Sequence, residues 1–272
     1  MEEAMPSTVI VDTRAVIKDA LRSPLLEEQE LVQEFAREEG LRQEAIHQAE
    51  RSGGWTSVQE AKMIMGRHFV GLAQIIDRFN LGLAPSDVRG LDFVPYPKDF
   101  LWKLHWSHLL IAGVPVSMLE TRQAAYRKVV AKLGDFSYDS QHFATRRMVA
   151  RWYLVSKDIA SGSLYKTMQE HDARIFNDPM CERLGAPETA YVVAVARLLA
   201  SEQMLRNVAA FTSDFILEEQ GDEAKRRGIP PKKWPVFVGF SGEFGVGVGT
   251  CPGDRPMANI GALVSVRPCR KQ

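Results

Sequence analysis

The sequence predicts a mainly α protein, with a multi-helix bundle-like body followed by a small C-terminal antiparallel β-meander (α+β). Two observations support this fold class. Apolar residues recur at helical spacing through the first two-thirds of the chain, and the period changes to two after residue 235. The predicted organisation is a helical body over residues 1–220, a basic Pro-containing linker over 221–235, and a three-stranded β-meander over 236–272, packed on the body or extending from it.

The helices are predicted from their caps and their periodicity. Ser23-Pro24 opens a long helix, because Ser supplies a cap oxygen and Pro suits the first helical position. Thr56 or Ser57 caps the next helix, with Glu60 placed for a capping box, and its many apolar residues through residue 79 indicate central burial. Further helices are expected over residues 98–112, 117–133, 140–161, 163–176 and 187–220.

The three strands of the meander are predicted at residues 236–240, 245–249 and 260–266, with turns at Ser241-Gly242 and at residues 252–254. In the second strand Gly245, Gly247 and Gly249 alternate, which leaves one face without side chains. Such a face permits close approach, either by another part of this chain or by a partner. The three glycines are therefore candidate interface residues.

The composition is that of an ordinary globular protein. The 272 residues include 34 Lys+Arg and 34 Asp+Glu, and 45% of them are hydrophobic. These values exclude a disordered, collagen-like or histone-like chain. The neutral total conceals a polarity, because residues 1–121 carry 12 basic and 18 acidic side chains, whereas residues 122–272 carry 22 and 16. An electrostatic partner is therefore not excluded.

Localisation is predicted to be cytoplasmic. Three widely spaced cysteines, Cys181, Cys251 and Cys269, fit free thiols in a reducing compartment, although a bridge between Cys251 and Cys269 remains an alternative. No apolar run approaches the roughly 20 residues that span a bilayer, so no membrane span is expected. The acidic N-terminus does not resemble a secretory signal.

A basic segment with interspersed aromatic residues runs from Arg122 to Lys157. It contains eight basic and two acidic residues. Arginine together with aromatic side chains is typical of nucleic-acid surfaces and also of protein interfaces. A third interpretation is a solvated helix face whose aromatic residues point inward. The candidate binding residues are Arg122, Arg127, Lys128, Lys132, Arg146, Arg147, Arg151 and Trp152.

A metal centre is an alternative that the sequence does not favour. His105 and His108 lie three residues apart on an expected helix, a spacing that can share a metal, with Glu44, His47, His142 or His171 as further candidate ligands. No Walker loop, Cys-x-x-Cys or His-Glu-x-x-His motif is present, and Gly239-Phe240-Ser241-Gly242 lacks the pattern of a nucleophile elbow. No cofactor is therefore expected.

The preferred functional hypothesis is a non-enzymatic protein that docks to other macromolecules as a component or adaptor of a larger assembly, with a protein partner or self-association. The first alternative is a nucleic-acid-binding regulatory protein that uses the helices of Arg122–Lys157. The second is a metal-dependent enzyme with a site at His105 and His108.

Overall fold

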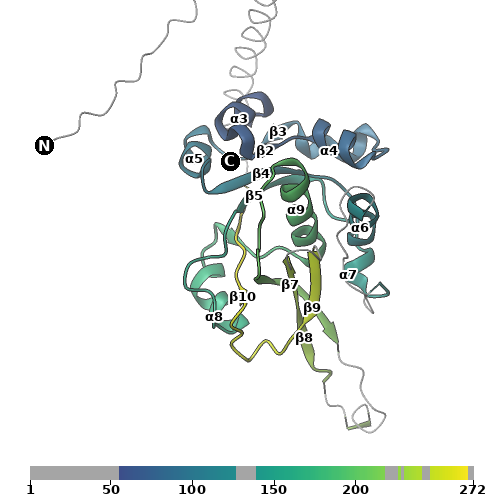
Figure 1. Ribbon diagram of the computed structural model, residues 1–272, viewed down its shortest axis with the longest axis vertical. Helices are drawn as coiled ribbons and strands as arrows, with labels where there is room; N and C mark the ends of the chain where they lie inside the picture. The colour runs from purple at the N-terminus through teal and green to yellow at the C-terminus, as the bar shows by residue number, and fades with distance from the viewer. Residues whose placement is uncertain (1–54, 127–138, 218–225, 228–229, 241–245, 269–272) are drawn as a thin grey trace, which may run out of the picture.

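The computed structural model describes residues 55–126, 139–217, 226–227, 230–240 and 246–268 (Figure 1). The helices predicted before residue 54, the end of the helix predicted over 117–133, and residues 221–225 and 228–229 of the predicted linker lie outside these residues.

In the described part of the chain the helices are short, with one exception. The longest of these helices is α9, which comprises 14 residues. Three further turns are of 3-10 or π type: η1 (Gly66–His68), η2 (Pro85–Leu91) and η3 (Asp172–Phe176). The α-helices are α3 (Val58–Met65), α4 (Leu72–Phe79), α5 (Lys98–Leu104), α6 (Met118–Tyr126), α7 (His142–Thr145), α8 (Met168–His171) and α9 (Ala186–Leu199).

The described strands form three sheets. The five-stranded sheet has the order β2-β4-β5-β11-β6, in which β2 and β4 are parallel and the other pairs are antiparallel. Its strands are β2 (Phe69–Val70), β4 (His108–Gly113), β5 (Arg151–Ser156), β11 (Ser265–Val266) and β6 (Cys181–Glu182).

The four-stranded sheet has the order β10-β7-β8-β9, with β10 and β7 parallel and the remaining pairs antiparallel. The third sheet is the antiparallel pair β1 (Thr56–Ser57) and β3 (Phe93–Val94). The strands of the four-stranded sheet are β10 (Ile260–Gly261), β7 (Ala209–Leu217), β8 (Lys233–Phe240) and β9 (Val246–Thr250).

Helix α9 connects the two larger sheets. It packs against β2 and β4 of one sheet and against β7, β8 and β9 of the other, and Figure 1 shows it at the centre of the molecule between them. Its residues from Ala186 to Ala196 are all buried, as expected of a helix that is apolar on every side. A smaller second core, which includes Met168, Phe211 and Ile260, involves β7 and β10 of the four-stranded sheet.

The predicted mainly α fold class is wrong, because several expected helices are strands. The segment expected to be helical over 98–112 contains α5 and then β4, and the segment over 140–161 contains α7 and then β5. Strands β4 and β5 are interior strands of the sheet, and most of their residues are buried. Their sequences are therefore short continuous apolar runs, in which periodicity does not distinguish a buried strand from a helix.

The expected helix over 187–220 is also divided. Helix α9 ends at Leu199, and Ser201, Leu205 and Asn207 have positive φ angles of 56°, 54° and 58° before β7 begins. A helix cannot continue through left-handed residues, so the chain turns and returns as a strand. Likewise, Gly66 at φ 54° ends α3, and the helix expected over residues 57–79 becomes α3, β2 and α4.

The predicted antiparallel meander needs correction as well. The first two strands exist as the antiparallel hairpin β8–β9. The third segment instead supplies two short strands in different sheets, β10 beside β7 and β11 between β5 and β6. Strands on both sides of the linker predicted at 221–235 therefore share one sheet, because β7 pairs with β8.

Candidate functional site

A groove of about 470 Å³ lies between the end of α4 and the exposed side of α6, within the size range of ligand pockets. We call it the α4–α6 groove. It combines apolar side chains with two amides and one ion pair. Its lining residues are Phe79, Asn80, Leu81, Gly82, Leu83, Val116, Glu120, Gln123, Ala124 and Arg147.

The apolar side of the groove forms where α4 stops. Asn80 adopts a left-handed φ of 52° and its N–H donates to the carbonyl of Ile76, which ends the helix. The chain then runs as an irregular segment in which Leu81 and Leu83 are half-buried against the main core. Part of both leucine side chains therefore remains accessible.

The polar side of the groove is built by a capping box at the start of α6. The N–H of Glu120 donates to Ser117 Oγ over 3.1 Å, and the N–H of Ser117 donates to the Glu120 carboxylate over 2.7 Å. Arg147 reaches the same carboxylate through Nε at 3.2 Å and Nη2 at 2.9 Å. Both polar side chains are therefore fixed before anything enters the groove.

Glu120 is an anion at neutral pH. Burial alone would raise the pKa of Glu120, but the hydrogen bonds from Arg147 and Ser117 together outweigh it, so the pKa lies below its usual value. The partner Arg147 remains 59% exposed at its side chain. The groove thus presents an acceptor and a donor side by side, with no net charge at this ion pair.

Each arginine of the predicted basic surface that the structure describes is bound to a carboxylate. Arg122 pairs with Asp139 at 2.8 Å, Arg147 with Glu120 at 2.9 Å, and Arg151 with Glu182 at 2.9 Å. Arg127, Lys128 and Lys132 lie outside the described residues. Since Glu120 and Glu182 come from outside the segment 122–157, the fold supplies acidic partners that are absent from the local sequence. Binding of a partner by these residues remains a prediction.

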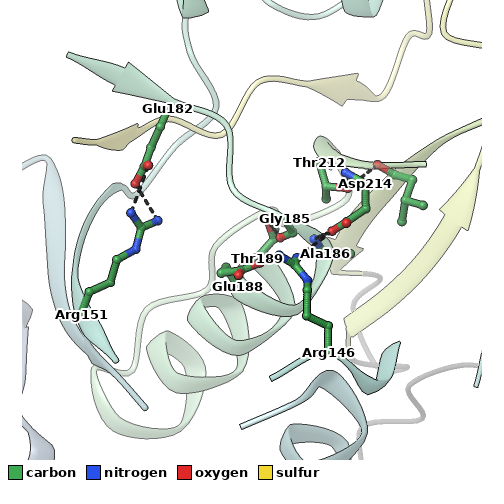
Figure 2. Close-up of polar contacts among 10 residues, drawn as sticks. Arg146, Arg151, Glu182, Gly185, Ala186, Glu188, Thr189, Thr212 and Asp214 are labelled. Carbon is green, nitrogen blue, oxygen red and sulfur yellow. Dashed lines mark hydrogen bonds and ion pairs between the residues drawn. The ribbon is translucent and has the colours of Figure 1, made fainter. Parts of the chain in front are cut away.

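Arg146 belongs to a polar network at the start of α9 (Figure 2). Its Nη2 lies 3.2 Å from both Glu188 and Asp214, and Asp214 also accepts the N–H of Ala186 over 2.7 Å. A Cβ at Gly185 would lie 2.5 Å from Arg146 Nη2 and 2.8 Å from Asp214 Oδ2, so a larger residue there would require these side chains to shift. Gly185, Glu188 and Asp214 were not predicted from the sequence, because nothing local connects them to Arg146.

Three aromatic residues of the basic segment are buried in the described part of the chain. Trp152 is 1% exposed, packs its ring 5.3 Å from that of Phe69 and donates its indole N–H to the carbonyl of Leu91 over 3.3 Å. Phe143 and Tyr153 are also buried. This placement corresponds to the interpretation in which the aromatic side chains belong to the core.

The two histidines proposed as alternative metal ligands each place one ring nitrogen, Nδ1, next to a protein oxygen. His105 Nδ1 lies 2.6 Å from the Trp102 carbonyl oxygen, and His108 Nδ1 lies 2.9 Å from Ser107 Oγ. Burial, assisted by the charge of Lys157, lowers the pKa of His108 to about 4. Within the part of the chain that the structure describes, no cluster of three or more potential ligands could hold a metal ion.

A further histidine, which no sequence motif indicates, joins this end of the five-stranded sheet. His68 is buried, and its Nδ1 donates to the carbonyl of His105. Its Nε2 lies 3.2 Å from Arg67 Nε, 3.4 Å from Lys157 Nζ and 3.4 Å from Glu202 Oε1. These contacts join the start of β2, the turn before β4 and the end of β5.

The glycines of β9 have different surroundings. A Cβ at Gly249 would overlap the Phe237 ring, whereas at Gly247 the nearest heavy atom would be the Gly239 carbonyl oxygen, 4.0 Å away. Gly247 lines a shallow depression of about 400 Å³ with Gly239 and Ala209. Gly245 lies outside the described residues. An interface role for these glycines remains a prediction.

Comparison with known proteins gives no relative: no protein-family model, no curated protein and no solved structure matches the chain. Among the described residues, no helix is both long and apolar enough to cross a bilayer.

Proposed function

We propose that the protein is a non-enzymatic docking protein, a component or adaptor of a larger assembly, and that a short extended segment of a partner protein binds in its α4–α6 groove. The single observation that carries the proposal is the groove itself, because its apolar residues adjoin the preformed Glu120–Arg147 pair.

The chemistry of the groove supports a peptide as the occupant. An apolar side chain of the partner would bury against Phe79, Leu83 and Val116. The main-chain N–H and C=O beside it match the Glu120 carboxylate and the Arg147 guanidinium, and the exposed amides of Asn80 and Gln123 offer both donors and acceptors. The partner contributes the polar main chain and the groove contributes fixed hydrogen-bonding groups.

The same chemistry disfavours a nucleic acid at this place. Phosphates bind through an excess of uncompensated cations and release counterions when they do so. Arg147 shares its charge with Glu120, and Arg122, Arg146 and Arg151 are likewise paired. A polyanion would have to displace these carboxylates, whereas a neutral peptide would not.

The proposal includes a cytoplasmic location. Cys181 and Cys251 are free thiols, and Cys269 lies outside the described residues. Free thiols persist in a reducing compartment.

The test compares two tryptophan substitutions on neighbouring helices. Ala124→Trp on α6 fills the groove, and Ala73→Trp adds the same ring at an exposed position of α4 outside the lining. Peptides selected from a random phage-displayed library on the wild-type chain should carry an apolar anchor. In titration calorimetry, Ala124→Trp should bind these peptides at least about tenfold more weakly than the wild type, which corresponds to about 1.4 kcal/mol. Ala73→Trp should bind them with the same affinity as the wild type.

The test includes two outcomes that would contradict the proposal. One is that no peptide binds in a manner sensitive to Ala124→Trp, once circular dichroism and thermal melting have shown that the variant is folded. The other is binding of nucleic acid that weakens steeply with salt and is lost on charge reversal at Arg147 and Arg151, which would favour the nucleic-acid alternative.

A further inference from the structure

Two tryptophans project from the end of α5. Trp102 is 56% exposed and Trp106 is 66% exposed, four residues further along the chain. Tryptophan is highly buried on average in folded proteins, so two exposed indoles so close in sequence indicate a contact surface. We call residues 102–107 the Trp turn. It lies outside the α4–α6 groove, since none of its residues lines that groove.

The Trp turn is held in place by hydrogen bonds at Ser107, its last residue. The N–H of Ser107 donates to the Leu104 carbonyl over 3.0 Å, and the N–H of Lys157 donates to the Ser107 carbonyl over 3.0 Å. The His105 ring packs edge-on against Trp102 at 5.5 Å, while the buried His68 donates to the His105 carbonyl. The exposed indoles are therefore presented by an anchored turn, and not by a frayed helix end.

Cationic side chains accompany the two indoles. Lys103 is exposed between them, and Arg67 is exposed beside His68, the residue that binds the turn. Lys157 is half-buried and directs its Nζ to His68. The acidic groups nearby are Asp99 on α5, the exposed Asp158 next to Lys157, Glu202 at His68 Nε2, and Glu60, which pairs with Lys98 at 2.8 Å.

This combination fits a lipid surface better than a protein surface. Protein interfaces are enriched in Trp but depleted in Lys. The headgroup region of a bilayer accepts both, because indole rings prefer the interface between the acyl chains and water, and Lys or Arg beside them attract anionic phosphates. In α5 the buried Leu101 packs inward while Trp102 and Lys103 point outward, as in a surface-bound helix.

We infer that the Trp turn is a peripheral anchor for an anionic phospholipid bilayer. Trp102 and Trp106 enter the headgroup layer, and Lys103 and Arg67 contact lipid phosphates. With two indoles and few cations the attachment is weak and reversible, and it holds the chain on the membrane surface without crossing it. The anionic leaflet available to a cytoplasmic protein is the inner one.

The experiment uses the full chain with vesicles of phosphatidylcholine alone or mixed with phosphatidylglycerol. The wild type should float with the mixed vesicles and shift its tryptophan emission to the blue, and brominated lipids should quench that emission. The double variant Trp102→Ser/Trp106→Ser should bind at least tenfold more weakly. The control Tyr165→Ser, which removes a 68% exposed aromatic ring elsewhere, should bind like the wild type.

Charge and fold are tested separately. Lys103→Glu should weaken binding to the mixed vesicles, and added salt should do the same. If the double variant does not fold, the single variant Trp106→Ser carries the test. Ala124→Trp should bind vesicles normally, which separates this inference from the proposed function.

The inference is wrong if the wild type does not bind the mixed vesicles, or if it binds them equally well without the two indoles. It is also wrong if a protein partner covers the two indoles and vesicles do not compete with that partner for binding.

Discussion

At the scale of single residues, two glycines of β9 belong to one sequence pattern but have different surroundings in the fold. The alternation in β9 indicates only that one strand face lacks side chains. In the fold, Gly249 lies over the ring of its cross-strand partner Phe237, so its hydrogen is required by intramolecular packing. Gly247 faces Gly239 across the strands, and a methyl group added there would meet no atom closer than 4.0 Å. Of these two residues, only Gly247 leaves room for an added side chain or for a partner.

We therefore expect Gly249→Ala and Gly247→Ala to differ in their effect on stability. Gly249→Ala overpacks the contact with Phe237 and should lower the free energy of unfolding by about 1–3 kcal/mol. Gly247→Ala should change it by at most about 1 kcal/mol and in the stabilising direction, because alanine restricts the unfolded chain. Urea unfolding of the two variants measures the difference, and equal losses would show that the packing does not explain Gly249.

At the scale of elements, α9 depends on the polar network at its first turn. Its N-terminal N–H groups need acceptors, and Asp214 reaches across from β7 to accept the N–H of Ala186. Asp214 also holds Arg146 together with Glu188, and its side chain is 20% exposed. The Asp214 carboxylate therefore accepts a hydrogen bond at the start of the helix and also neutralises part of the charge of the partly buried Arg146 guanidinium.

Replacement of Asp214 by Asn should lower the free energy of unfolding by about 2–3 kcal/mol, because a charge-assisted bond is lost and Arg146 keeps one anionic partner instead of two. Asp139→Asn is the matched control. Asp139 pairs with Arg122 at the surface with 47% of its side chain exposed, and such pairs contribute about 0–1 kcal/mol. Thermal or urea unfolding of both variants decides the matter, and a loss at Asp139 as large as that at Asp214 would contradict this account.

At the scale of the whole molecule, histidines on separate elements link folding to pH. Burial, with a contribution from Lys157, lowers the pKa of His108 to about 4. Burial also lowers the pKa of His171, which is 1% exposed, and its Nε2 donates to the Ser163 carbonyl over 2.7 Å. Both side chains are neutral in the native state at neutral pH, whereas the unfolded chain takes up their protons near pH 6.5.

The direction in which stability changes with pH follows from this difference in proton binding. Between about pH 6.5 and pH 4 the unfolded state binds more protons, so the free energy of unfolding should fall as the pH falls through this window. The contribution of His108 is at most about 3 kcal/mol. The urea midpoint, measured at several pH values, should change less steeply with pH in His108→Gln than in the wild type. The assignment to His108 would be refuted if His108→Gln and the wild type showed the same dependence of stability on pH.

Local signals in the sequence were sufficient for several elements. Ser57 accepts the N–H of Glu60 at the start of α3, as the capping pattern predicts. The change of period after residue 235 correctly indicates the β8–β9 hairpin. Strands β4 and β5 escaped prediction because their apolar runs carry no periodicity, and a run of that length is compatible with either a strand or a helix.

The sequence by itself determined the capping residues, the terminal hairpin and the concentration of basic residues between Arg122 and Lys157. Only the tertiary structure decided that Arg146, Arg147 and Arg151 would meet Glu188, Glu120 and Glu182, and that Trp152 would enter the core while Trp102 and Trp106 remained outside. The physical reason is the separation along the sequence of the groups that interact. Caps and turns depend on neighbours within a few residues, whereas an ion pair or a groove depends on which elements the burial of apolar surface brings together.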